Sequence, residues 1–240
     1  MISKNQVKYI RQLEQKKYRR REGLFVAEGT KVVGDLLSHY QPRAVFATPD
    51  WQVPEGVNVQ RVTEEELRRL SFLQHPQQVL ALFPLPTMAA ANCPLSIALD
   101  GIQDPGNLGT IIRIADWFGI DQIICSEDTV DAWNPKVVQA TMGSIARVNI
   151  IYNNLSDFLD TLPPDYPVYG TLLDGDNIYT QPLTPHGLIV MGNEGNGISP
   201  EIRQKVNHRL LIPSYRNDDT AESLNVAIAT AITCAEFRRR

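Results

Sequence analysis

In the first part of the chain, the pattern of apolar and polar residues indicates a small α/β unit. Helix-forming residues with apolar positions three or four apart predict one helix over residues 5–21. Short apolar runs predict strands, and amphipathic segments predict further helices. The expected strands are at 24–27, 44–47, 57–62 and 79–83, and the expected helices are at 31–38 and 64–70.

From residue 95 onward the pattern becomes more regular. Short apolar segments without strict alternation are separated by helical segments. The expected strands are at 95–99, 122–125, 148–152, 168–173, 188–191 and 209–212, and the expected helices are at 107–118, 135–143, 156–162, 200–205 and 221–239. Such a succession is typical of a parallel sheet covered by helices on both faces. The sequence therefore predicts an α/β fold in which a parallel-sheet domain follows a small α/β domain.

A segment rich in proline and small residues separates the two parts. Pro84, Pro86 and Pro94 flank residues 88–92, which are mostly alanine. This composition is typical of a linker. We therefore expect a first domain over residues 1–88 and a second over residues 95–240.

The overall net charge of −4 conceals a strongly basic N-terminus. Residues 1–21 carry eight Lys and Arg against one Glu, a net charge of +7. Clustered cations gain affinity for phosphates by releasing counterions, so this segment indicates a polyanionic partner. A solvated basic helix face is the alternative, and charge alone does not decide between them.

Composition excludes several classes of protein. The chain is 43% hydrophobic and 21% charged, as in ordinary globular proteins, and its longest apolar segment, 226–235, is too short for a membrane helix. Three cysteines without a CxxC pair argue against a disulfide-bonded secreted domain. We expect a cytoplasmic protein. The four histidines lack metal-ligand spacing, so no metal site is expected.

The first of three unusual segments, residues 99–113, follows a predicted strand. Its glycines and proline predict a turn, and Asn107 is the expected N-cap of the next helix. Arg113 is then expected on the first turns of that helix, facing the C-terminal edge of the sheet. An ordinary arginine on a helix surface is the alternative interpretation of this residue alone.

The other two segments also follow predicted strands. Residues 188–198 place Glu194 among the glycines 192, 195 and 197. Their GxxGxG spacing differs from the dinucleotide-binding GxGxxG, and no P-loop motif is present, so a nicotinamide-dependent oxidoreductase is disfavoured. In the third segment, Ser223 and Asn225 precede an apolar helix, and capping explains only one of them readily.

Taken together, these segments resemble the SpoU (TrmH-like) family of RNA ribose 2′-O-methyltransferases, of the SPOUT class. The matching motifs are Asp104-Pro105-x-Asn107-x-Gly109-x-x-x-Arg113, Met191-Gly192-x-Glu194-Gly195-x-Gly197, Ile212-Pro213 and Ser223-Leu224-Asn225-Val226-Ala227. The similarity spans residues 95–236. Residues 1–85 more loosely resemble the family's small RNA-binding domain, most closely at 25–29. The loop 214–222 is longer than the family pattern and carries three acidic residues.

The resemblance implies a deep trefoil knot and S-adenosylmethionine as cofactor. It implies cofactor contacts from residues on several loops, which are Thr171, Leu172, Gly192, Ile212 and Leu224. It also implies a homodimer. An RNA substrate fits the basic N-terminus, and ribosomal RNA is favoured over transfer RNA because the N-terminal domain is complete.

The resemblance further implies that Arg113, Asn107, Glu194, Ser223 and Asn225 act in methyl transfer. Arginine normally keeps its proton, so we expect Arg113 to orient the ribose hydroxyl or a neighbouring phosphate and to stabilise developing charge. Glu194 and Asn107 are expected to fix Arg113 and the loops, and Ser223 and Asn225 to hold the third loop or the ribose.

Alternative functions remain open at this stage. They are 2′-O-methylation of transfer RNA and a non-catalytic RNA-binding module.

Two other features are expected to be structural. The three tryptophans, Trp51, Trp117 and Trp133, are too dispersed for a base-stacking platform and are expected to pack in the interior. Asp174-Gly175-Asp176 lacks the rest of a calcium loop and is expected to form a turn.

Overall fold

The computed structural model describes residues 1–87, 91, 93–216 and 223–239. These residues form two compact units. The first contains Met1–Thr87 and Asp131–Ala146, and the second contains Met88–Val130 and Arg147–Arg240. Residues 131–146, which the sequence pattern places in the second domain, therefore pack within the first unit. The predicted linker residues 88–90 and 92 lie outside the described residues.

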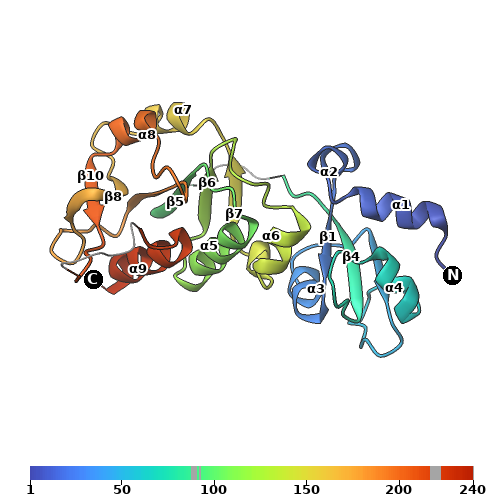
Figure 1. Cartoon of the computed structure of the whole chain (residues 1–240). Helices are drawn as coiled ribbons and strands as arrows, with labels where there is room; N and C mark the ends of the chain where they lie inside the picture. Colours follow the sequence, from blue (N-terminus) through green and yellow to red (C-terminus); the bar gives the residue numbers. More distant parts are fainter. Residues whose placement is uncertain (88–90, 92, 217–222, 240) are drawn as a thin grey trace. The chain divides into compact units, whose positions relative to one another are not determined.

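A four-stranded sheet forms the centre of the first unit (Figure 1). Its strands are β1 (Leu24–Glu28), β2 (Ala44–Ala47), β3 (Gln60–Arg61) and β4 (Val79–Pro84), in the order β1-β4-β2-β3. Strand β4 is antiparallel to both of its neighbours, and β2 and β3 are parallel. The strand expected at 57–62 is confined to two residues.

Six helical segments belong to the first unit. They are α1 (Lys4–Gln12), α2 (Lys16–Glu22), α3 (Thr30–Leu37), α4 (Glu64–Leu70), α6 (Pro135–Ala140) and the 3₁₀ segment η1 (Ser144–Ala146). Helix α6 contacts β1, which explains why residues 131–146 join this unit. Met142, between α6 and η1, has a left-handed φ of 51° and ends the helix that was expected to reach residue 143.

The prediction of one helix over residues 5–21 is wrong, because a non-helical segment separates α1 from α2. Arg19, only 2% exposed, donates from Nη1 to the carbonyl oxygens of Leu13 at 2.8 Å and Glu14 at 2.6 Å. In a continuous helix these oxygens would accept from backbone N–H groups four residues later. Arg19 also pairs with Asp131, its Nε lying 3.0 Å from Oδ2. The basic segment thus uses one of its cations inside the unit.

A six-stranded parallel sheet forms the second unit, which confirms the predicted fold class. Its strands are β5 (Leu95–Asp100), β6 (Gln122–Cys125), β7 (Asn149–Tyr152), β8 (Val168–Asn177), β9 (Gly187–Gly192) and β10 (His208–Leu211). They lie in the order β10-β8-β9-β5-β6-β7, with every neighbouring pair parallel.

Strand β8 is longer than the sequence suggests, and the turn expected at Asp174-Gly175-Asp176 is wrong. After a register shift, Asp176 and Asn177 pair with Leu210 and Leu211 of β10. A Cβ atom at Gly175 would lie 2.6 Å from the carbonyl carbon of Leu210. Glycine therefore permits a close approach of two strands here, where the sequence alone indicates a bend.

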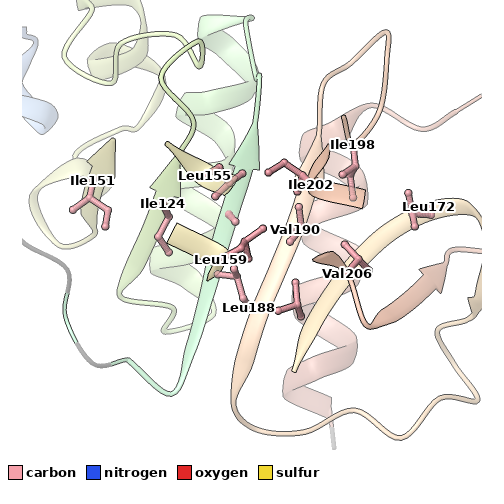
Figure 2. Close-up of a cluster of buried hydrophobic side chains, with 12 residues drawn as sticks. Ile124, Ile151, Leu155, Leu159, Leu172, Leu188, Val190, Ile198, Ile202 and Val206 are labelled. Atoms are coloured by element: carbon pink, nitrogen blue, oxygen red, sulfur yellow. The ribbon is translucent and has the colours of Figure 1, made fainter. Parts of the chain in front are cut away.

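Helices cover both faces of this sheet (Figure 1). On one face, α5 (Pro105–Trp117) packs beside α9 (Val226–Arg239). On the other, α7 (Leu155–Asp160) contacts α8 (Pro200–Lys205). Figure 2 shows the core beneath α7 and α8, where side chains of the two helices meet those of β6, β7, β8 and β9.

The strand order places a ligand crevice at one position in the sheet. From β5 the chain proceeds through β6 to β7 on one side, whereas β9, β8 and β10 lie on the other side. In parallel α/β sheets, ligands bind at the carboxyl ends of the strands where the order reverses. The loops after β5 and β9 are therefore the expected place for a site.

We predict that replacing Glu28 changes the pH dependence of stability. This β1 carboxylate is 5% exposed and accepts hydrogen bonds from Ser71 Oγ and from Phe72 N at 2.7 Å. Burial raises the pKa of Glu28 above its ordinary value, so the folded protein holds this proton more tightly than the unfolded chain. The stability associated with the protonated form is therefore lost as pH rises through the folded-state pKa. Relative to wild type, Glu28→Gln should gain stability between pH 4 and pH 8.

Urea unfolding at several pH values measures this effect, and Glu66→Gln is the matched control. Backbone hydrogen bonds from Thr63 and Ile2 lower the pKa of Glu66, so its stabilising effect is lost as pH falls. Glu66→Gln should therefore lose relative stability as pH rises. A stability difference between Glu28→Gln and wild type that does not change with pH would contradict the raised pKa of Glu28.

Candidate active site at the carboxyl edge of the parallel sheet

The side chain of Asn107 lies at the centre of the candidate site. Asp104, rather than Asn107 as predicted, is the N-cap of α5, since its carboxylate accepts from Asn107 N at 2.8 Å. The Asn107 amide is consequently available for other contacts. Its Nδ2 donates to Glu194 Oε1 at 3.0 Å, and its Oδ1 accepts from Asn225 Nδ2 at 2.9 Å. All three sequence motifs therefore meet at one residue.

Glu194 is held by the backbone as well as by Asn107. The N–H groups of Gln103 and Asp104 approach its two carboxylate oxygens at 3.4 and 3.3 Å. The carboxylate thus receives hydrogen bonds from the loop after β5 and from the first turns of α5. It joins the loop after β9 to that segment, so both sides of the crevice are fixed together.

Asn193 shapes the loop that carries Glu194, and the sequence analysis did not single it out. Its Oδ1 accepts from the N–H groups of Gly195 and Asn196 at 2.9 and 3.0 Å, while its Nδ2 donates to Gly101 O at 2.6 Å. Its backbone N–H and C=O pair with those of Gly197. An asparagine that bonds the backbone two and three residues later is a recognisable turn signal, so the sequence could have indicated this role.

Asn225 and Ser223 have different positions. Asn225 caps α9, because its Oδ1 accepts from Ala227 N at 3.0 Å and Ile228 N at 3.3 Å while its Nδ2 reaches Asn107. Helix α9 therefore begins at Val226, and residues 217–222, in the long loop noted above, lie outside the described residues. Ser223 lines the cavity described next and makes no hydrogen bond to another described residue.

A cavity of about 590 Å³ lies beside these residues. Its walls come from the ends of β8, β9 and β10, from the loop 193–198 and from the start of α9. The structure brings together on its lining all five residues predicted to contact a cofactor, namely Thr171, Leu172, Gly192, Ile212 and Leu224. Glu194 and Ser223 also line it, and Asn107 and Asn225 lie behind Glu194.

The backbone forms much of the cavity wall at Gly192. An ideal Cβ atom at this position would overlap the carbonyl carbon of Gly197 and the nitrogen of Ile198. Only a glycine lets the end of β9 pass this close to the returning loop. The wall at Gly192 is thus formed by contact between two backbone segments, and apolar side chains such as Leu172 and Ile212 complete it.

Arg113 lies apart from the other predicted residues. It is exposed in the middle of α5, does not line the cavity, and forms no hydrogen bond or ion pair with another described residue. The expectation that it lies on the first turns and is fixed by Glu194 and Asn107 is therefore wrong for the single chain.

Trp117 follows one turn later on α5 and is 85% exposed, so its expected interior packing is also wrong. Trp51 and Trp133 are buried, as expected.

Within the described ranges, no helix is long and apolar enough to cross a membrane. Nor do three or more His, Cys, Asp or Glu side chains among those residues gather where a metal ion could bind.

Comparison with known proteins identifies the family. Residues 94–235 match the SpoU rRNA Methylase family, and residues 4–81 match the MRM3-like substrate binding domain. The chain belongs to the SpoU rRNA methylase family. It is 32% identical over 244 residues to the 23S rRNA (guanosine(2553)-2′-O)-methyltransferase RlmP of Bacillus subtilis, covering 98% of this chain and 97% of that protein.

Solved structures agree with this membership. A protein of the TrmH family from Porphyromonas gingivalis superposes with a TM-score of 0.91 at 42% identity, covering 100% of this chain and 99% of that one. An rRNA methyltransferase from Sinorhizobium meliloti, solved with bound AdoMet, gives a TM-score of 0.84 at 32% identity, covering 100% and 97%. The predicted SpoU-type fold is confirmed, and the trefoil knot stays a prediction.

We predict that Gly192→Ala destabilises the second unit. The added methyl group would overlap backbone atoms of Gly197 and Ile198, which cannot rotate away as a side chain could. Overpacking of this kind costs about 1–3 kcal/mol. Gly195→Ala is the matched control, because its Cβ would meet only Asn193 Oδ1 at an ordinary 3.6 Å. Chemical denaturation of both variants measures the difference, and equal stability of the two would contradict the close approach.

Proposed function

We propose that the protein transfers a methyl group from S-adenosylmethionine to the 2′-hydroxyl of a ribose in RNA, with ribosomal RNA as the substrate. The observation that carries this proposal is the meeting of Asn107, Glu194 and Asn225 beside the cavity in a chain of the SpoU family. The names of the relatives support ribosomal RNA, since RlmP is a 23S rRNA methyltransferase and a human relative is a mitochondrial rRNA methyltransferase.

The cavity fits S-adenosylmethionine in size and lining. Its volume of about 590 Å³ falls in the range of small-molecule sites. Leu172, Ile212 and Leu224 offer apolar surface for the adenine, while Thr171 and the backbone near Gly192 offer polar groups. The cofactor supplies an electrophilic methyl group on its sulfonium. The protein must therefore hold the donor and present a ribose hydroxyl in line with that methyl group.

The polar residues then have distinct tasks. The bonded amides of Asn107 and Asn225 and the Glu194 carboxylate fix the three loops that form the cavity. The hydroxyl of Ser223 on the cavity wall is placed to contact the ribose. Because Arg113 lies outside the cavity, we assign its guanidinium to the RNA, where it orients the hydroxyl or a neighbouring phosphate and stabilises developing negative charge. A substrate phosphate is then the candidate proton acceptor.

We assign RNA binding to residues 1–88 and methyl transfer to residues 95–240. The match of residues 4–81 to a substrate binding domain supports the first assignment. Arg11 and Arg19 of the basic segment are engaged internally, with Ser71 O and with Asp131. Lys4, Lys8 and Arg20 are exposed and available to phosphates.

We further propose that the protein is a homodimer in the cytoplasm. Helices α5 and α9 lie side by side (Figure 1) and expose large apolar side chains, with Trp117 at 85% and Ile228 at 53%. A second copy covering these helices would remove this surface from water. Three free cysteines, at positions 93, 125 and 234, suit a reducing compartment.

The first prediction from this function concerns Arg113. With labelled S-adenosylmethionine and undermodified RNA, wild-type protein should label ribosomal RNA in preference to transfer RNA. Arg113→Ala should lower kcat about 100- to 1000-fold, as for loss of a charge-stabilising group. Its affinity for S-adenosylmethionine should be unchanged, because Arg113 does not line the cavity.

Three outcomes would revise this assignment. Arg113→Lys with wild-type kcat at saturating RNA would show that the planar guanidinium is not needed. Label in transfer RNA alone would replace the substrate class. RNA binding without any methyl transfer, despite bound cofactor, would favour the binding module.

The second prediction concerns the dimer. Ile228→Glu places a charge on the exposed apolar surface of α9 and should convert a dimer to a monomer of about 27 kDa. Tyr215→Glu is the control, since Tyr215 is 85% exposed and lies outside both helices. Light scattering at micromolar concentration measures the mass. A wild-type protein of monomer mass would exclude the proposed dimer.

A further inference from the structure

The cavity lining contains three charged residues among those that the structure describes, which are Asp174, Glu194 and Arg203. Glu194 is occupied by Asn107 and by two backbone N–H groups. Because Asp174 and Glu194 are acidic, Arg203 is the one cation on the described lining. The cofactor assigned in the proposed function has an amino-acid tail that ends in a carboxylate, and a carboxylate leaving bulk water needs strong donors.

The position of Arg203 makes it available to such a group. It lies on α8, and its guanidinium pairs with Asp174 near the end of β8. Its side chain lines the cavity and is 36% exposed, so part of it is in contact with solvent. Arg19, by contrast, is buried.

A second arginine shares the same carboxylate. Arg209 Nη1 lies 3.7 Å from Asp174 Oδ2, so two guanidinium groups face one acidic side chain. The cluster has one positive charge in excess. If Arg203 turns toward a ligand, Asp174 retains Arg209 as a partner, and no charge is left without compensation. The arrangement is thus suited to exchange of one arginine between Asp174 and a bound anion.

We propose that Arg203 binds the carboxylate of the methionine tail of S-adenosylmethionine in the cavity. This inference rests on the proposed function and adds a residue that none of the sequence motifs contains. The planar guanidinium offers two parallel N–H groups to a carboxylate, which gives orientation as well as affinity. The tail would then lie beside Asp174, whose carboxylate would be the partner of its ammonium group. The alternative is that Arg203 only fastens α8 to β8.

Binding of two ligands that differ only in the carboxylate distinguishes these roles. Calorimetry without RNA gives Kd for S-adenosylmethionine and for decarboxylated S-adenosylmethionine. Wild-type protein should bind the intact cofactor about 10- to 100-fold more tightly, the range for a hydrogen bond to a charged group. In Arg203→Ala this preference should fall to less than about twofold, with the affinity for the decarboxylated ligand retained.

Lys205→Ala is the matched control. Lys205 lies on the same helix and pairs with Asp160, but it does not line the cavity. This variant should keep the wild-type preference. If Arg203→Ala weakens the binding of both ligands equally, or of neither, the inference is overturned and the role of Arg203 is structural. Wild-type protein that binds neither ligand would overturn the proposed function itself, and the inference with it.

Discussion

The organisation of the second unit depends on the side-chain amide of Asn107. Its Nδ2 donates to Glu194, which is 87 residues away along the chain. Its Oδ1 accepts from Asn225, which is 118 residues away. Because the sheet order reverses between β5 and β9, the loops after these strands emerge side by side and need a polar connection. Capping of α5 by Asp104 leaves the Asn107 amide free to provide it. One short side chain thus fixes the relative positions of three loops that surround the cavity.

The shape of the cavity wall depends on the missing side chain at Gly192 as much as on the side chains that line it. At Gly192 two backbone segments touch, so the loop 193–198 returns directly over the end of β9. The amides of this loop are already ordered by Asn193, which lowers the cost of fixing it around a ligand. Of the three charged residues on the described lining, Glu194 is held by Asn107 and by backbone N–H groups, whereas Asp174 and Arg203 pair with each other and remain partly exposed.

The sequence predicts the parallel sheet well because its short apolar strands and the turns between them are local features. The errors arise where distant residues decide. Arg19 interrupts the basic helix because Asp131, 112 residues away, holds it. Residues 174–177 extend β8 because β10 pairs with them. Periodicity could not bring Asn107, Glu194 and Asn225 together, and it was the family resemblance that singled them out. The N-cap error was avoidable, since Asp104 followed by a proline is a typical helix start.

The separation of Arg113 from the cavity constrains how the reaction is assembled. Six residues along a helix correspond to a rotation of about 240°, so Asn107 and Arg113 project from different sides of α5. The first side supports the loops of the cavity, and the second is exposed together with Trp117. Under the proposed function, a ribose hydroxyl has to reach the methyl group and Arg113 at the same time. The single described chain does not bring these groups together, so the proposal requires that RNA or a second copy of the chain, covering the exposed side of α5, completes the site.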